Sequence, residues 1–276
     1  MSRLLAANLL RLKKSILFRM EMILMVVLGI YVAVVSYISI KEDGVSISLD
    51  NGFFHCAIVI LILAAALCSL YLGTEYSDGT LRNKVVIGRR RSSVYLANLI
   101  TCALACIILC ALYFAASLCA GLPLLGPFER DPRQIAVYVL CTFLLALTLS
   151  ALFTLAAMLI QNKAVTVAVC LLGSFFLLLS GIYMDSRLHE PETYPAYSLT
   201  VNGEVLPQDD IPNPYYLRGN TRKVYEFLLD FLPGGQAIQI DTKTAAHPER
   251  LPLYAVIITV LTTGCGIYLF NRKDLR

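Results

Sequence analysis

The chain has 276 residues, of which 58% are hydrophobic and 15% are charged, with a formal net charge of +4. Soluble domains have about 25% charged residues, so this chain lacks the charge to cover a surface that faces water. The composition therefore excludes an ordinary soluble enzyme. It predicts an all-α polytopic membrane protein whose helices cross a lipid bilayer.

The amino-terminal segment, residues 1–21, precedes the first long apolar run. Within residues 2–19, apolar side chains recur at helical spacing: Leu5, Leu9, Leu12 and Ile16. Basic residues face the other way, so we expect an amphipathic helix on the cytoplasmic membrane surface, where it attracts anionic lipid. The alternative is that this segment only extends the first transmembrane helix into the cytoplasm.

Six segments contain the roughly 20 apolar residues that a membrane-crossing helix needs. They are residues 22–40, 53–73, 96–122, 135–160, 164–184 and 251–270. Within these limits the sequence has no Asp, Glu, Lys or Arg. Ion-coupled transporters and intramembrane enzymes depend on polar groups there, so we expect neither, and no catalytic residue in this chain.

The distribution of charge predicts the orientation. With the amino terminus inside, 14 Lys and Arg residues but only four acidic residues lie on the cytoplasmic side, whereas acidic residues outnumber basic ones on the other side. This asymmetry follows the positive-inside rule and places both termini in the cytoplasm. The basic, Trp-free composition is typical of a bacterial plasma-membrane protein.

Nine cysteines invite a metal or redox interpretation, but all nine lie in apolar segments. A thiolate ligand must ionise, which hydrocarbon opposes. We therefore interpret the cysteines as small core side chains and expect neither a metal site nor a disulfide framework.

Residues 74–95 form the only long cytoplasmic loop between the spans. Ser77 or Asp78 is suited to cap a short helix that starts near Thr80. The face of this helix that would dock into a groove on a partner consists of Leu81 and Val85. Alternatively, the basic residues of the loop only fix the topology, an interpretation that suits the arginine run at its end better than residues 75–81.

Residues 185–250 form a long extracytoplasmic loop before the last span. Residues 198–206 predict a β-hairpin around Asn202-Gly203. An amphipathic helix over residues 221–232 follows, and its apolar face consists of Val224, Phe227, Leu228 and Phe231. We expect this helix to lie on the outer leaflet or to form a re-entrant element over the bundle mouth. A small soluble domain is the alternative.

Over nearly its whole length the chain resembles the permease subunit of a type-2 ATP-binding-cassette (ABC) transporter. The resemblance rests on the amphipathic first helix, the six spans and the long loop before the sixth. Its most specific part is the motif Glu75-x-x-x-Gly79-Thr80-Leu81, which in that family leads into the helix that contacts the ATPase subunit. Residues 251–276, the last span with its basic tail, are similar to the end of bacterial members in the run Phe270-x-Arg272-Lys273-Asp274-Leu275.

The resemblance implies that two permease copies pair with two cytoplasmic ATPase subunits, and that ATP and Mg²⁺ bind to those subunits rather than to this chain. It implies an ATPase-coupling segment made of Glu75, Gly79, Thr80, Leu81, Arg82 and Val85. It also implies a re-entrant gate region near the outer mouth, made of Phe227, Leu228, Phe231, Pro233, Gly234, Gly235 and Gln236. The substrate path would run between the two permeases, along the first, second and fifth spans.

Together these features predict the membrane subunit of an ATP-driven exporter, surrounded by membrane lipids and without a nucleic-acid partner. An uncharged wall suits an amphipathic or hydrophobic cargo such as a peptide, a lipid or a drug. The alternative is a non-catalytic membrane sensor or scaffold that binds a ligand through residues 185–250.

Overall fold

A computed structural model describes residues 1–44, 47–194, 199–201, 204–206 and 211–273. In chain order the elements are α1 Ser2–Lys14, α2 Ile16–Asp43, α3 Asp50–Phe53, α4 Cys56–Ser77, α5 Thr80–Val86, α6 Arg91–Leu125, α7 Pro132–Leu159, α8 Lys163–Leu188, β1 Thr193–Tyr194, β2 Leu199–Val201, β3 Glu204–Leu206, β4 Ile211–Pro212, α9 Gly219–Phe231, α10 Pro233–Thr242 and α11 Arg250–Arg272. The chain is therefore an all-α polytopic protein.

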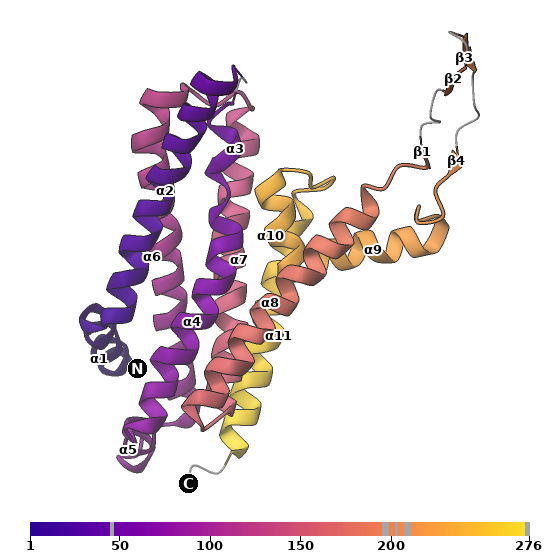
Figure 1. The fold of residues 1–276 in the computed structure, drawn as a ribbon. Helices are drawn as coiled ribbons and strands as arrows, with labels where there is room; N and C mark the ends of the chain where they lie inside the picture. The colour runs from indigo at the N-terminus through magenta and orange to yellow at the C-terminus, as the bar shows by residue number, and fades with distance from the viewer. Residues whose placement is uncertain (45–46, 195–198, 202–203, 207–210, 274–276) are drawn as a thin grey trace.

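Six of these helices are long and apolar enough to cross a membrane: α2, α4 (with α3 before it), α6, α7, α8 and α11. This confirms the six predicted spans. Both ends of the chain and α5 lie at the same end of the bundle, as Figure 1 shows. We call it the terminal end and the opposite end the distal end.

The amphipathic amino-terminal helix is shorter than predicted and is separate from the first span. Ser15 leaves helical geometry, with ψ at 125°, and its hydroxyl accepts a hydrogen bond from the Phe18 backbone N–H at 3.5 Å, which caps α2. The predicted stripe is also rotated: α1 buries Leu4, Asn8 and Leu12, so a polar side chain lies at the centre of its buried face.

The first span starts earlier than predicted, which places an acidic residue inside it. Glu21 lies in the second turn of α2 and is only 4% exposed. Neither of its carboxylate oxygens has a hydrogen-bond partner in the described part of the chain. The prediction that the membrane-crossing segments contain no charged residue is therefore wrong at this position.

α4 is the centre of the bundle. It packs against α7 and α8, while α2 packs along α6 and α11 packs along α7. Much of the outer surface of α2, α8 and α11 is apolar and exposed, as expected of helices that contact lipid. The side chains that fill the core include Ile60, Leu61, Leu67, Tyr113 and Phe153.

The segment between α8 and α11 has three parts. β1 pairs with β4 and β2 pairs with β3, both antiparallel, in an arm that extends away from the bundle (Figure 1). The β2–β3 pair confirms the predicted hairpin, although Asn202 and Gly203 lie outside the described residues. α9 then runs across rather than along the bundle, and its bounds differ from the predicted 221–232 by only two residues at the start and one at the end.

α10 is a short helix that is buried along almost its whole length, from Pro233 to Ile240. It packs against α8, α4 and α7. At its far end, Lys243 donates from Nζ to the Asp50 backbone oxygen at 2.7 Å, and Asp241 pairs with His55. These contacts hold α10 within the distal half of the bundle.

Candidate functional site

A buried carboxylate at the terminal end of the bundle lies between two cations from different helices. Glu75 is in the last turn of α4 and is 0% exposed. Its Oε1 atom lies 2.6 Å from a guanidinium nitrogen of Arg11 in α1 and 2.5 Å from Nζ of Lys84 in α5. The carboxylate therefore binds α1 and α5 to the end of the second span.

Two asparagines complete the group, which we call the Glu75 cluster (Glu75, Asn8, Arg11, Lys84 and Asn98). Asn98 of α6 donates from Nδ2 to the second oxygen of Glu75 at 2.9 Å. Asn8 donates to the Asn98 side-chain oxygen at 2.6 Å, and its own side-chain oxygen accepts from Lys84 at 3.0 Å. Both asparagines are buried, so every side chain of the cluster has a partner from another helix.

Tyr71, one turn before Glu75 on α4, holds the α1 side of the cluster. Its hydroxyl donates to the Asn8 backbone oxygen at 2.8 Å. The Arg11 guanidinium lies over the Tyr71 ring at 3.9 Å from its centre, and it also donates to the Tyr71 backbone oxygen at 3.3 Å. Planar stacking and directed donation of this kind are properties of arginine that lysine does not reproduce.

The charges of the cluster do not cancel, because one carboxylate faces two cations. A buried ion pair is costly to form, since both charges lose water, and it persists only where further hydrogen bonds satisfy the remaining atoms. Asn98 supplies such a bond to Glu75, and Asn8 supplies one to Lys84. Removing the carboxylate would leave both cations without a counter-ion.

The residues of the Glu-x-x-x-Gly-Thr-Leu motif each have a structural part in this region. Gly79 has φ at +65°, which reverses the chain between α4 and α5 and which other residues rarely adopt. Thr80 donates from its hydroxyl to the Glu75 backbone oxygen at 3.2 Å, and this bond satisfies one carbonyl at the end of α4. Leu81 is 0% exposed and anchors α5 to the bundle.

The structure corrects two details of the predicted coupling segment. α5 is preceded by Gly79, and neither Ser77 nor Asp78 caps it. Leu81 is buried against the chain itself, so it does not belong to an exposed docking face, whereas Val85 is partly exposed and its contact with a partner stays a prediction. Leu81 therefore fixes α5 in place and is not available to a partner.

The exposed apolar surface of this region lies at the end of α5. Val86 and Ile87 are 75% and 78% exposed, the highest values of any large hydrophobic side chains in the described residues. Three exposed arginines surround them: Arg82, Arg89 and Arg90. We call this group of five the Val86 tip.

The last described residues are also tied to the terminal end. Arg91 donates to the backbone oxygen of Asn271 at 3.1 Å and to that of Lys273. Lys273 donates from Nζ to the Tyr76 hydroxyl at 3.0 Å and to the Met158 backbone oxygen at 3.1 Å. Burial lowers the pKa of Lys273 to about 8.

At the predicted gate region, glycines allow α10 to approach α8 very closely. A methyl group on Gly234 would lie 1.8 Å from the Leu177 backbone oxygen, and one on Gly181 would lie 2.6 Å from the Gly234 backbone. The Gln236 side chain donates to the backbone oxygens of Asp230 and Phe231 at 3.0 and 3.3 Å, which closes the turn between α9 and α10. Pro233 begins α10 at the position where a helix lacks an N–H partner.

The apolar face of α9 differs from the one predicted. Leu229 is the buried side chain of α9, whereas Val224 and Phe227 are about half exposed and Leu228 is partly buried. Phe227 and Phe231 stack on each other at 5.6 Å between ring centres, and both meet the ring of Tyr254 edge-on. This aromatic group links α9 to the start of α11.

The cysteines differ from the prediction at two positions, because Cys119 and Cys265 are exposed on the outer surface of the bundle. The remaining seven are buried. Among the residues that the structure describes, no group of three His, Cys, Asp or Glu side chains is placed to hold a metal ion.

Six helices long enough to cross a membrane, together with a buried cluster that joins α1 and α5 to α4 and α6, define a multi-pass membrane protein. The family model described as ABC-2 family transporter protein matches residues 4–180, well over half of the chain, and no curated protein matches it. The chain belongs to this family and is a membrane permease of an ABC transporter. The family implies association with an ABC ATPase subunit. The matched region contains the whole Glu75 cluster.

Several residues of the cluster were not predicted from the sequence. Asn8 interrupts an otherwise apolar helical face, and Asn98 is a single amide near the start of a long apolar segment. Both exceptions are signals of a buried polar partner, because an isolated amide is costly in an apolar environment. For Arg11 and Lys84, the sequence contains many equivalent bases, and only the structure distinguishes these two.

Proposed function

We propose that this chain is the membrane-spanning subunit of an ATP-driven exporter, and that the Glu75 cluster transmits movement of α5 to the spans. The observation that carries the proposal is the connection of four helices through a single carboxylate. Arg11 of α1, Lys84 of α5 and Asn98 of α6 all contact Glu75 of α4 directly. A force on α5 therefore reaches the second and third spans, α4 and α6, and the amino-terminal helix α1 without passing through a flexible loop.

The Val86 tip is the surface that we propose binds the ATPase subunit. Its two apolar side chains are exposed at the terminal end, which cannot be explained by packing within this chain. Exposed apolar groups surrounded by polar residues are typical of protein–protein contacts. The arginines around them favour a partner groove with acidic residues on its rim.

In this proposal the terminal end is cytoplasmic, because the basic residues of α1, α5 and the tail gather there. ATP and Mg²⁺ bind to the partner, and this chain has no ATPase site. Two copies of the permease and two ATPase subunits form the transporter in a bacterial plasma membrane. The cargo is amphipathic or hydrophobic, because the spans contain no charged residue within their predicted limits that would select a charged substrate.

The direct test changes the exposed tip without touching the cluster. Val86→Asp and Ile87→Asp, singly and together, place a carboxylate in the proposed contact while leaving Leu81 and Lys84 in place. We expect the double variant to express and purify normally. The amount of ATPase that copurifies with it in mild detergent should fall at least ten-fold. The measurement is the molar ratio of ATPase to permease in the purified complex.

The matched control is Ile211→Asp. Ile211 lies in the arm formed by the β-strands, and its side chain is 52% exposed. We expect it to retain the ATPase at the level of the unchanged chain. A double Val86/Ile87 variant that keeps a full complement of ATPase would show that the Val86 tip is not the docking surface. Purification without any nucleotide-binding partner would contradict the proposed function itself.

A further inference from the structure

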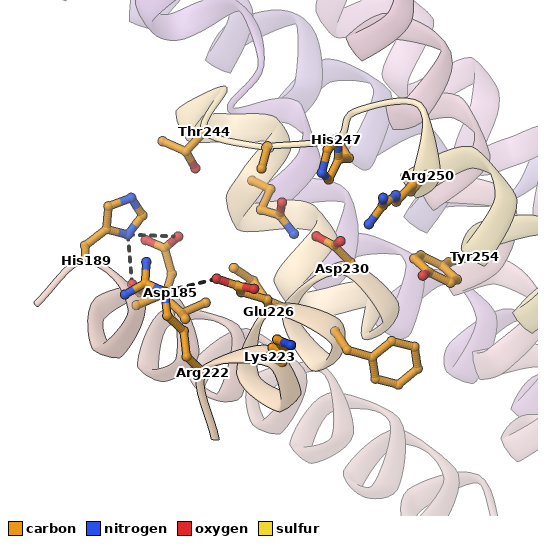
Figure 2. Close-up of a pocket in the computed structure, with 15 residues that line it drawn as sticks. Asp185, His189, Arg222, Lys223, Glu226, Asp230, Thr244, His247, Arg250 and Tyr254 are labelled. Atoms are coloured by element: carbon orange, nitrogen blue, oxygen red, sulfur yellow. Dashed lines mark hydrogen bonds and ion pairs between the residues drawn. The ribbon is translucent and has the colours of Figure 1, made fainter. Parts of the chain in front are cut away.

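A cavity of about 520 Å³ lies at the distal end, between α8, α9, α10 and α11 (Figure 2). The spanning helix α8 ends at Leu188 and the spanning helix α11 begins at Arg250, and both residues line the cavity. Membrane-crossing helices end where hydrocarbon gives way to headgroups. The cavity is therefore at the boundary between membrane and water, far from the Glu75 cluster.

The cavity wall contains charged side chains of both signs, and only some of them form ion pairs. Arg222 pairs with Glu226 at 3.1 Å, and His189 lies 3.5 Å from Asp185. Three other charged side chains on the wall make no ion pair with any described residue: Lys223, Asp230 and Arg250. In Figure 2, Asp230 and Arg250 point toward one another across the cavity.

Two observations on the cavity wall favour the binding of a polar ligand. Burial raises the pKa of the Asp230 carboxyl, and the nearby Gln239 amide, Arg250 and His247 offset this only in part. Gln239 lines the cavity and is 3% exposed, and its amide nitrogen has no hydrogen-bond partner of normal geometry in the described residues. The Gln239 amide therefore lies near Asp230 without a well-formed hydrogen bond, and a bound polar group would give this buried donor a better partner.

An apolar surface leads from the cavity into the membrane. Arg250, Tyr254, Ile257 and Leu261 recur at intervals of four, three and four residues, so they share one face of α11. Tyr254 lines the cavity, and Ile257 and Leu261 are 38% and 63% exposed. A ligand with its polar end in the cavity therefore has an apolar path for a hydrocarbon chain.

We propose that this cavity binds the headgroup of a phosphoethanolamine phospholipid, with the phosphate at Arg250 and Lys223, the ammonium at Asp230, and an acyl chain along Ile257 and Leu261. The equal number of carboxylates and Lys or Arg side chains on the wall opposes a purely anionic headgroup. The unpaired cations oppose a purely cationic ligand. A zwitterion pairs its phosphate with the unpaired cations and its ammonium with the carboxylate. A primary ammonium also supplies N–H donors that a quaternary ammonium lacks.

The test measures retained lipid and does not depend on transport or on the ATPase. The full-length chain, with any subunit that accompanies it, is placed in nanodiscs of equal phosphatidylethanolamine, phosphatidylcholine and phosphatidylglycerol. It is then extracted in mild detergent and analysed by native mass spectrometry. We expect phosphatidylethanolamine to be retained at least five-fold over either other lipid.

Two variants that each remove one charge locate the site. Asp230→Asn and Arg250→Gln should each abolish the preference for phosphatidylethanolamine, whereas Glu129→Gln, an exposed carboxylate at the distal end outside the cavity, should leave it unchanged. Equal retention of all three lipids by the unchanged chain would overturn the proposal. So would an unchanged preference in both cavity variants.

A competition experiment with a soluble headgroup analogue distinguishes a bound lipid from a free zwitterion. Glycerophosphoethanolamine carries the same headgroup without acyl chains. We expect it to displace the retained lipid only at concentrations at least 100-fold above those of the lipid, because the apolar path contributes to binding. Displacement at equal concentration would show that the cavity takes a soluble ligand and that the assignment to a membrane lipid is wrong.

Discussion

At the scale of single residues, Glu75 is the side chain on which the terminal end depends. Its one carboxylate neutralises a cation from each of two neighbouring helices, and it has no contact with solvent. Lys84 and Arg11 are 19% and 36% exposed, so solvent can stabilise them in part if the carboxylate is lost. The cost of losing Glu75 is therefore smaller than for a fully buried pair.

We predict that Glu75→Gln lowers the free energy of local opening of α1 and α5 by about 1–3 kcal/mol, because two neighbouring cations lose their shared counter-ion. Backbone hydrogen exchange in residues 2–14 and 80–86 should become faster, and ATP hydrolysis by the complex should no longer be matched by transport. Lys84→Met is the matched variant: it removes one cation and its bond to Asn8 but keeps the Arg11–Glu75 pair, so exchange in α1 should accelerate less than in Glu75→Gln. Wild-type exchange rates in Glu75→Gln would contradict the role given to the cluster.

At the scale of elements, the contact between α8 and α10 is close enough that it leaves no room for a methyl group on either of two glycines. It depends on Gly181 and Gly234, because any side chain there would overlap backbone atoms of the other helix. In membranes, where helix contacts gain little from the hydrophobic effect, such close backbone packing is a main source of association.

We predict that Gly234→Ala displaces α10 from α8 and reduces transport at least ten-fold. To detect the displacement, Ala237, which is 0% exposed, is replaced by Cys as a reporter. The reporter should react with a small maleimide in the Gly234→Ala background and not in the parent. Gly264→Ala is the control, since a methyl group there would meet no atom within 4 Å. An unreactive reporter in both backgrounds would show that the contact tolerates the added methyl group.

The sequence predicted the elements better than the contacts between them. Apolar runs of about 20 residues identify spanning helices directly, so all six were found. The face of α1 was not found, because Asn8 counts as polar in a periodicity yet lies at the centre of the buried side. For the same reason, the buried Glu21 was assigned to the cytoplasmic surface: it stands beside basic residues in the sequence, and only the early start of α2 places it inside.

The sequence predicted which motif forms the candidate site, but it did not predict how the residues of the site are arranged in space. Gly79, Thr80 and Leu81 were singled out by their order, but which of them is exposed depends on how α5 folds back on the bundle. The partners of Glu75 lie at least nine residues away in sequence, on three other helices. No local pattern specifies such contacts.

At the scale of the whole molecule, the distribution of basic residues makes the orientation testable. We predict that the terminal end faces the cytoplasm. In a background with Cys119 and Cys265 replaced by Ser, Asn220→Cys in α9 should react with a membrane-impermeant maleimide in intact cells. Asn83→Cys in α5 should react only after the cells are permeabilised; both asparagines are exposed. The reverse labelling pattern would invert the topology and contradict the proposed position of the ATPase.

The shared oxygen of Glu75 has a consequence for how easily the terminal end can rearrange. An isolated ion pair, once separated, leaves a bare charge on each side. Here the departure of α5 would carry away Lys84 and leave Arg11 still bound, and it would also end the repulsion between the two cations. The buried carboxylate would therefore keep a counter-ion while α5 is away, and Lys84 could return to the same oxygen.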